Sequence, residues 1–455
     1  MRSLIFKRHL KETLALAGPI TASKAGAQVI TILNFSMVGR IGTSALSHFG
    51  LATTPFFTLN LVGLCLLSGL SFATARARAA GDFEEVARQG RSAAWLWIVV
   101  STALIASTLL YWALPVSQNL GSETREVLLV LVLGAPAFIG YFCVSNFLEG
   151  MEQPRASAWV TIAGAAANFS LNIWGLNQFS KLLSPEVIVA LGMVATRWLM
   201  FLAMIAWSFR KLLRVKSRIQ FWPGIRDLSG VPFHLKFGAP IAFAYGLRSG
   251  ALSGLTIAAS ALGAPEVAAF SLAIQLMNLG NMIATSVSSA TIVRISRFVG
   301  LKNRAEVRRS VQASLLIMAL GLIVIASTLG AFAEKILPSL SKDPDVTAIL
   351  SRSLGFVLAF FSVDCLCTVL MGSLRPLGDR WIPQAGFGAI LFVVGVPLSW
   401  FSIRYFAFGI GSMFLSMILA YLLAGAFVFH RAQRTGVLRT SAPYPNRDNI
   451  GQNRA

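Results

Sequence analysis

Long apolar segments separated by short polar breaks run through most of the chain. About twelve of them reach the length that a helix needs to cross a bilayer, roughly 20 residues. The segments are Thr13–Gly39, Ala45–Ala75, Ser92–Leu114, Val127–Leu148, Ala156–Leu176, Val187–Phe209, Phe237–Leu262, Val267–Val293, Val311–Phe332, Val346–Met371, Trp381–Ile403 and Phe406–Phe429. We therefore predict an all-α membrane protein with twelve transmembrane helices.

Short sequences repeat between the two halves at one offset, 221 residues. This offset takes Ala17–Ile20 (AGPI) onto Gly238–Ile241 (GAPI), and Glu85 onto Glu306. Six spans separate the copies, so both copies cross the membrane in the same direction. The pattern predicts two six-helix lobes related by a parallel pseudo-two-fold repeat, with a substrate site between them near mid-membrane.

The expected domain boundaries follow from the repeat and from composition. We predict an N-terminal lobe at 1–209, a basic cytoplasmic linker at 210–236 and a C-terminal lobe at 237–435. The remaining tail, 436–455, is polar and without apolar periodicity, which is typical of disorder.

Composition agrees with a membrane protein. Of 455 residues, 55% are hydrophobic and only 13% are charged, about half the share of charge in soluble domains. The basic start of the chain leads into an apolar run without a small-residue cleavage site, so we expect no cleaved signal peptide.

The net charge of +21 could indicate nucleic-acid binding, but the distribution of the charges favours the positive-inside rule of membrane proteins as its explanation. About 29 of the 39 Lys and Arg residues lie on the side of the termini and about 6 on the other, which by the positive-inside rule places both termini in the cytoplasm. We expect a monomer in the bacterial inner membrane whose partners are lipid and a small-molecule substrate, with no nucleic acid.

Polar side chains form stripes on four of the predicted spans. Such stripes favour a water-filled cavity, although any single residue could be a hydrogen bond between helices. The candidate cavity residues are Lys24, Gln28, Thr31, Asn34, Asn168, Asn172, Tyr245, Arg248, Gln275, Asn278 and Asn281. Pro19 and Pro240 are expected to kink the first and seventh spans and to act as hinges.

Asp364 is the one acid that we place deep in the membrane. A packing hydrogen bond or a neutralising salt bridge could explain it, but a lone intramembrane carboxylate favours an ion-coupling site. The sequence contains no phosphate-binding loop, nucleophile elbow or zinc spacing. We therefore expect neither an enzyme nor a primary ATP pump, with no metal site and no cofactor beyond the coupling ion, H⁺ or Na⁺.

Four segments resemble the multidrug and toxic compound extrusion (MATE) transporters. They are NFSMVGRIGTSALSHFGLATTPFF, AAFSLAIQLMNLGNMIATSVSSA, NFLEGMEQPRASAWV and GSLRPLGDRWIPQ, and their order and spacing match over nearly the whole chain. The resemblance implies a V-shaped bundle of two six-helix lobes. It also implies drug efflux by alternating access, driven by entry of sodium or protons.

The chain departs from the family pattern at its acidic positions. Asn34 and Asn172 stand where the resemblance implies acids on the first and fifth spans, and Arg248 stands where one branch has a glutamate. Asp364 matches the aspartate of the tenth span. A sodium site wants several oxygen ligands, so the loss of the other acids favours protons as the coupling ion.

The buried cations suggest a substrate class. Lys24 and Arg248 would make the cavity electropositive, Arg248 could pair with Asp364, and the cavity would favour anionic or zwitterionic compounds. An alternative in the same superfamily is a flippase for a lipid-linked saccharide precursor. A scaffold or receptor that kept the fold without ion coupling is a third reading.

Overall fold

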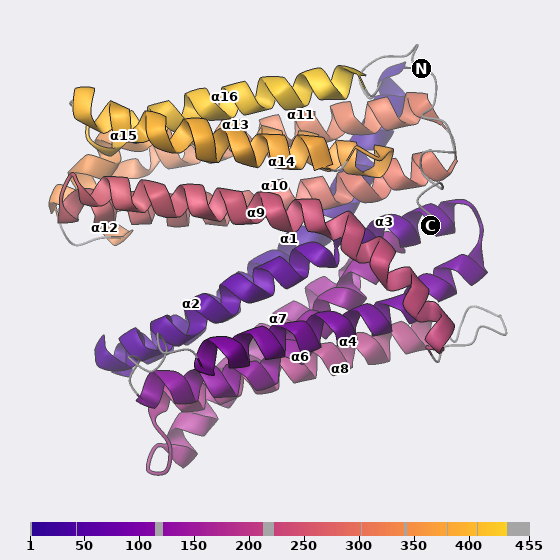
Figure 1. Cartoon of the computed structure of the whole chain (residues 1–455), viewed down its shortest axis with the longest axis horizontal. Helices are drawn as coiled ribbons and strands as arrows, with labels where there is room; N and C mark the ends of the chain where they lie inside the picture. The colour runs from indigo at the N-terminus through magenta and orange to yellow at the C-terminus, as the bar shows by residue number, and fades with distance from the viewer. Residues whose placement is uncertain are drawn as a thin grey trace. The chain divides into compact units, whose positions relative to one another are not determined.

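The computed structural model describes residues 2–41, 43–113, 122–212, 223–301, 303–340, 344–379, 381–406 and 408–434. These ranges are all-α and contain no strand. The expected tail at 436–455 and linker residues 213–222 lie outside them. The helices, labelled in Figure 1, are α1 (Arg2–Ile41), α2 (Thr43–Leu66), α3 (Ser68–Ala79), α4 (Phe83–Ala113), α6 (Ser122–Gly150), α7 (Arg155–Phe179), α8 (Pro185–Leu212), α9 (Val231–Ser260), α10 (Ala264–Gly300), α11 (Arg304–Ala331), α12 (Ala333–Leu340), α13 (Pro344–Leu374), α14 (Trp381–Ile390), α15 (Val396–Tyr405) and α16 (Ile410–Arg434).

Nine helical stretches of the described chain are long and apolar enough to cross a membrane. They coincide with nine of the expected spans. The other three expected spans are also helical, as α1, α7 and α9, and these are three of the helices that carry the predicted polar stripes. Polar side chains such as these lower the mean hydropathy of a helix.

The chain divides by its internal packing into two compact units. One consists of residues 1–17 with 243–455, and the other of Gly18–Ala242. The boundaries fall inside α1 and α9, close to Pro19 and Pro240, rather than in the basic linker. The lobes predicted from the sequence, 1–209 and 237–435, stay predictions, as does the hinge role of the two prolines.

Two expected spans are interrupted helices. The second breaks at Leu67 between α2 and α3, where the Ser68 hydroxyl donates to the Cys65 carbonyl at 2.7 Å and competes with the helical backbone bond. The eleventh contains a π-helical segment, Leu391–Gly395, between α14 and α15. Pro397 follows directly and removes a backbone donor, which explains the irregular turn.

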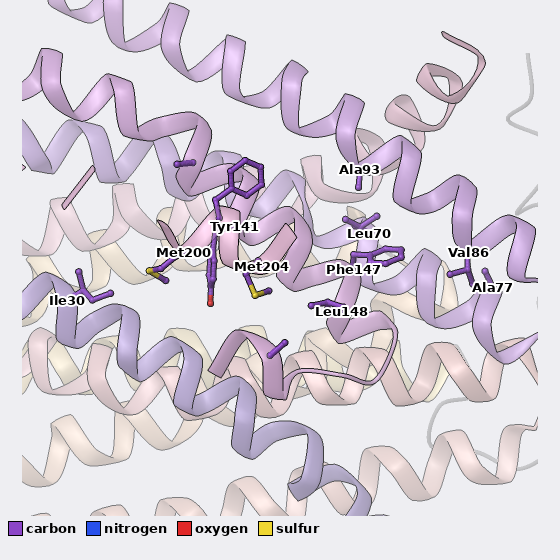
Figure 2. Close-up of a cluster of buried hydrophobic side chains, with 13 residues drawn as sticks. Ile30, Leu70, Ala77, Val86, Ala93, Tyr141, Phe147, Leu148, Met200 and Met204 are labelled. Atoms are coloured by element: carbon purple, nitrogen blue, oxygen red, sulfur yellow. The ribbon is translucent and has the colours of Figure 1, made fainter. Parts of the chain in front are cut away.

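The core of the Gly18–Ala242 unit includes a cluster of apolar side chains from several helices (Figure 2). Tyr141 stands between Met200 and Met204 in this cluster. Its hydroxyl lies 2.5 Å from that of Thr161 and 3.0 Å from that of Ser23, which satisfies a phenol that would otherwise be costly to bury.

The start of α9 packs on α3 within this same unit. Phe237 stacks on Phe72 with ring centroids 5.0 Å apart, and a Cβ at Gly69 would lie 3.2 Å from the Cα of His234. The preceding 3₁₀ turn, Ile225–Gly230, is tied to α4 by an ion pair between Asp227 and Arg91 at 3.1 Å. His234 is completely buried as a result.

Acidification is expected to destabilise the protein through His234. Burial lowers the pKa of His234 to about 4 from its ordinary 6.5. Between these values the unfolded state binds a proton that the folded state excludes, so stability falls as the pH falls through this window, by about 2 kcal/mol at pH 5. The melting temperature of the purified protein should fall between pH 7.5 and 5, and His234→Leu should flatten this dependence.

His430→Leu is the matched control for this pH dependence, because the His430 ring is exposed. It should keep the wild-type slope. A His234→Leu variant with the wild-type slope would show that another group is responsible.

The start of α1 is held in the other unit by a buried arginine of α10. Arg294 donates to the His9 carbonyl at 2.8 Å and to the Glu12 carboxylate at 3.0 Å, and it also bonds the Thr13 hydroxyl. His9 Nε2 lies 2.7 Å from Glu306, the repeat partner of Glu85. Burial, together with the Arg294 charge, lowers the pKa of His9, so this ring is neutral when it packs.

Candidate functional site

Asp364 lies at the centre of a polar site in the unit that contains 243–455. Its side chain is completely buried on α13. Its Oδ2 accepts from Arg248 of α9 at 2.7 Å and from the Asn281 amide of α10 at 2.9 Å. The expected ion pair is therefore present, and Asn281 is its third member.

Small residues allow the helices to approach closely enough to build this site. A Cβ at Gly280 would lie 2.2 Å from the Phe361 ring, and a Cβ at Gly372 would lie 2.1 Å from the Ser288 hydroxyl. A side chain at either glycine would force the facing Phe361 or Ser288 side chain to move, so these glycines favour a close approach of α10 and α13. This close packing brings the Asn281 amide, next to Gly280 in the chain, within hydrogen-bond distance of Asp364.

The two oxygens of the Asp364 carboxylate differ in their surroundings. Oδ2 receives both hydrogen bonds, whereas Oδ1 is buried and has no hydrogen-bond partner in the described part of the chain. The buried Tyr421, whose hydroxyl interacts with the Asp364 carboxylate, and the half-buried Tyr245 lie beside the pair. A buried oxygen without a donor is where a proton would bind at the lowest cost in lost hydrogen bonds.

The remaining candidates on α10 differ from Asn281 in exposure, and their place in a cavity stays a prediction. Gln275 and Asn278 are exposed, whereas Asn281 is half-buried against Asp364. The spacing of three residues along α10 suggested one continuous stripe, but only its last member reaches the carboxylate.

The Gly18–Ala242 unit holds a neutral amide network instead. The Asn172 amide donates to Asn34 Oδ1 at 2.8 Å and to Asn168 Oδ1 at 3.4 Å, and Asn168 donates to Thr196 at 3.3 Å. Asn34, Asn168 and Asn172 are buried. The structure thus brings together the candidates of the first and fifth spans and adds Thr196 of α8, which the sequence did not single out.

Lys24 has an acidic neighbour that the sequence analysis overlooked. Glu149 near the end of α6 is 9% exposed and lies within electrostatic range of Lys24. Asp364 is therefore not the only buried acid, and Lys24 contributes less free positive charge than expected. Glu149 was missed because it follows the predicted fourth span directly, where an acid could reach water.

Two other candidates of the first span, Gln28 and Thr31, are not part of this amide network. Gln28 is half-buried, and the Thr31 hydroxyl donates to the Ala27 carbonyl of its own helix at 3.2 Å. Among the described residues, no group of three or more His, Cys, Asp or Glu side chains is placed to hold a metal ion.

Comparisons with known proteins agree with this architecture. A family model described as MatE matches residues 19–174 and again 240–401, two segments that start at the spacing of the sequence repeat. The chain is 26% identical over 422 residues to a probable multidrug resistance protein NorM of Bradyrhizobium diazoefficiens, with 88% of each chain covered. It is 24% identical over 436 residues to a NorM protein of Caulobacter vibrioides, described in the same words, with 93% of this chain and 91% of that one covered.

Solved structures show the same fold at low identity. A eukaryotic MATE transporter, AtDTX14, superimposes with a TM-score of 0.84 at 16% identity, with coverage of 95% of this chain and 97% of that one. A MOP superfamily transporter from Pyrococcus furiosus gives 0.81 at 17% identity, with the same coverage. Because the family model matches well over half of the chain, in two copies spaced as the repeat, the chain belongs to the MatE family of membrane transporters.

Proposed function

We propose that this protein is a proton-coupled antiporter that exports small zwitterionic compounds, with Asp364 as the proton-binding group. The observation that carries the proposal is the pair of Asp364 and Arg248, in which one buried carboxylate oxygen has no hydrogen-bond partner among the described residues. The coupling ion, the charge of the substrate and the side of the membrane on which the termini lie are all part of what we propose.

The broader function follows from family membership. The protein is a secondary active efflux transporter and not an enzyme, as expected from the sequence, and several relatives are named multidrug resistance proteins. These comparisons do not favour the flippase reading. We further propose the bacterial inner membrane as its location, with both termini cytoplasmic according to the distribution of Lys and Arg. We also propose that the protein is a monomer and does not bind nucleic acid.

Protons suit the Asp364 site better than sodium. Sodium would need several oxygen ligands, and the Asp364 carboxylate already shares its position with the Arg248 guanidinium at 2.7 Å. A cation placed there would be repelled by the arginine. A proton needs only one oxygen, and Oδ1 offers it.

Antiport with protons is possible at this site for a zwitterionic substrate but not for a simple anion. An anion that binds Arg248 would release Asp364 from its ion pair and thereby favour protonation of Asp364. Because linkage is reciprocal, protons would then favour anion binding, which couples the two as symport. A zwitterion can place its carboxylate on Arg248 and its ammonium on Asp364, so that proton and substrate compete for one carboxylate. Competition of this kind is what antiport requires.

A relative of the same fold offers a parallel for an altered charge pattern. The Pyrococcus furiosus transporter is described as having a binding pocket of reversed polarity that suggests a different function. In the present chain Arg248 occupies a position where the family resemblance implies an acid in one branch. We therefore infer that Arg248 changes the charge of the substrate that the site accepts.

Substrate charge can be tested directly in proteoliposomes. With a pH gradient imposed, flux of an aromatic amino acid should exceed that of ethidium and of benzoate by roughly tenfold or more, because each of the latter lacks one charge-assisted contact of about 1.5–3 kcal/mol. Vesicles without protein supply the background rate. Rapid ethidium flux with no zwitterion flux would refute the substrate class, while any gradient-driven flux would still support a coupled transporter and exclude a scaffold.

A further inference from the structure

Another buried cation, Arg197, lies in the Gly18–Ala242 unit. Arg197 is in the middle of α8 and is 5% exposed. Its guanidinium carbon lies 4.6 Å from the centre of the Phe138 ring, and its Nη1 is buried without a hydrogen-bond partner. Within the described part of the chain, Arg197 makes no ion pair.

The unsatisfied guanidinium lines a small cavity between α2, α6 and α8. Its walls include Phe56 and Phe57 of α2, and Gly134 and Phe138 of α6. Arg197 is the only charged residue among the lining side chains. The space accommodates about one water-sized sphere.

Nearby backbone acceptors on α6 are already used by other donors. Pro136 interrupts the hydrogen bonding of this helix. The Trp198 indole donates to the Leu133 carbonyl at 3.1 Å, and the Trp97 indole donates to the Pro136 carbonyl at 2.7 Å. These two carbonyls of α6 beside Pro136 are thus bonded by indoles and not by Arg197.

The contact with Phe138 does not compensate the charge of Arg197. A desolvated cation–π contact is worth less than the cost of burying an unpaired ion. Among the described residues, the one ionisable neighbour of Arg197 is Tyr141, a phenol that is uncharged at neutral pH. A water molecule would supply a hydrogen bond but no counter-charge.

We propose that this cavity binds a monatomic anion, chloride, as the counter-ion of Arg197. A monatomic anion is only slightly larger than a water molecule and fits this space better than organic carboxylates and phosphates, which need room for several heavy atoms. The bound anion neutralises the guanidinium and ties α8 to α2 and α6.

Thermal unfolding of the purified full-length protein tests this site. At constant ionic strength, replacement of sodium gluconate by 100 mM sodium chloride should raise the wild-type melting temperature by roughly 5 °C, and bromide should act similarly. Arg197→Met should abolish the response. It should also unfold in gluconate no earlier than wild type, because the methionine removes the charge that required a counter-ion.

Arg155→Met, at the exposed start of α7, is the matched control and should keep the chloride response. A response retained in Arg197→Met, or absent from wild type, would overturn the proposal. If Arg197→Met does not fold, equilibrium dialysis of wild type with radioactive chloride decides: about one chloride per chain supports the site, and none shows that water alone fills it. Neither readout measures transport, so the result is independent of the role of Asp364.

Discussion

Replacement of Asp364 by asparagine should abolish gradient-driven efflux while the protein still reaches the membrane. The asparagine amide has nearly the same shape but cannot bind and release a proton in this pH range, so no group remains at this site to couple the gradient to the substrate. In proteoliposomes with an imposed pH gradient, flux should fall to the rate of empty vesicles. Wild-type flux in this variant would contradict the coupling role.

A loss of flux could also arise from lost stability, because the variant leaves Arg248 without its counter-charge. Removal of one partner of a buried ion pair costs about 3–5 kcal/mol. The double variant Asp364→Asn with Arg248→Met removes both charges and should recover much of the melting temperature without recovering transport. Recovery of both properties would show that the pair is structural only.

Gly238→Ala should prevent α9 from crossing the end of α2 and should reduce the yield of folded protein sharply. A Cβ at this position would lie 2.4 Å from the Leu66 Cα and 2.6 Å from the Cys65 carbonyl oxygen. These are backbone atoms that no rotamer change can move, so the cost should reach at least about 3 kcal/mol. The measurements are the monodisperse fraction in size-exclusion chromatography and the melting temperature.

Gly246→Ala is the control on the same helix. An added Cβ at Gly246 meets nothing within 4 Å, and alanine in a helix should stabilise by about 0.4–1 kcal/mol. Equal behaviour of the two variants would show that the contact between Gly238 and α2 does not limit folding.

The two units differ in how they neutralise buried charge. In one, Asp364 and Arg248 form a direct ion pair supported by Asn281. In the other, Lys24 and Glu149 interact electrostatically, an amide network stands where the family resemblance implies acids, and Arg197 makes no ion pair with any described residue. The repeat therefore conserves the helices but not their chemistry, and the coupling role is assigned to the Asp364 site alone.

Several site residues could be chosen from the sequence because burial of a polar group in lipid is costly wherever it occurs. This argument selected Asp364, Arg248 and Asn281 without any structure. It did not select Glu149, which follows its predicted span, or Thr196, whose single hydroxyl costs little to bury. It also could not tell that Asn281, and not Gln275 or Asn278, donates the hydrogen bond to Asp364 that the structure shows.

The sequence by itself determined the helices, the twelve expected spans and the repeat, because transfer of a segment into lipid depends on its own composition. Only the tertiary structure decided which charges meet. Arg248 and Asp364 are 116 residues apart, and their contact depends on the packing of separate helices at points such as Gly280 and Gly372. The tertiary structure also decided that the start of α1 packs with residues 243–455 and that the start of α9 packs within Gly18–Ala242. It further showed that Arg197 has no ion-pair partner among the described residues. Hydropathy is a sum over one segment, whereas an ion pair depends on positions that different segments set together.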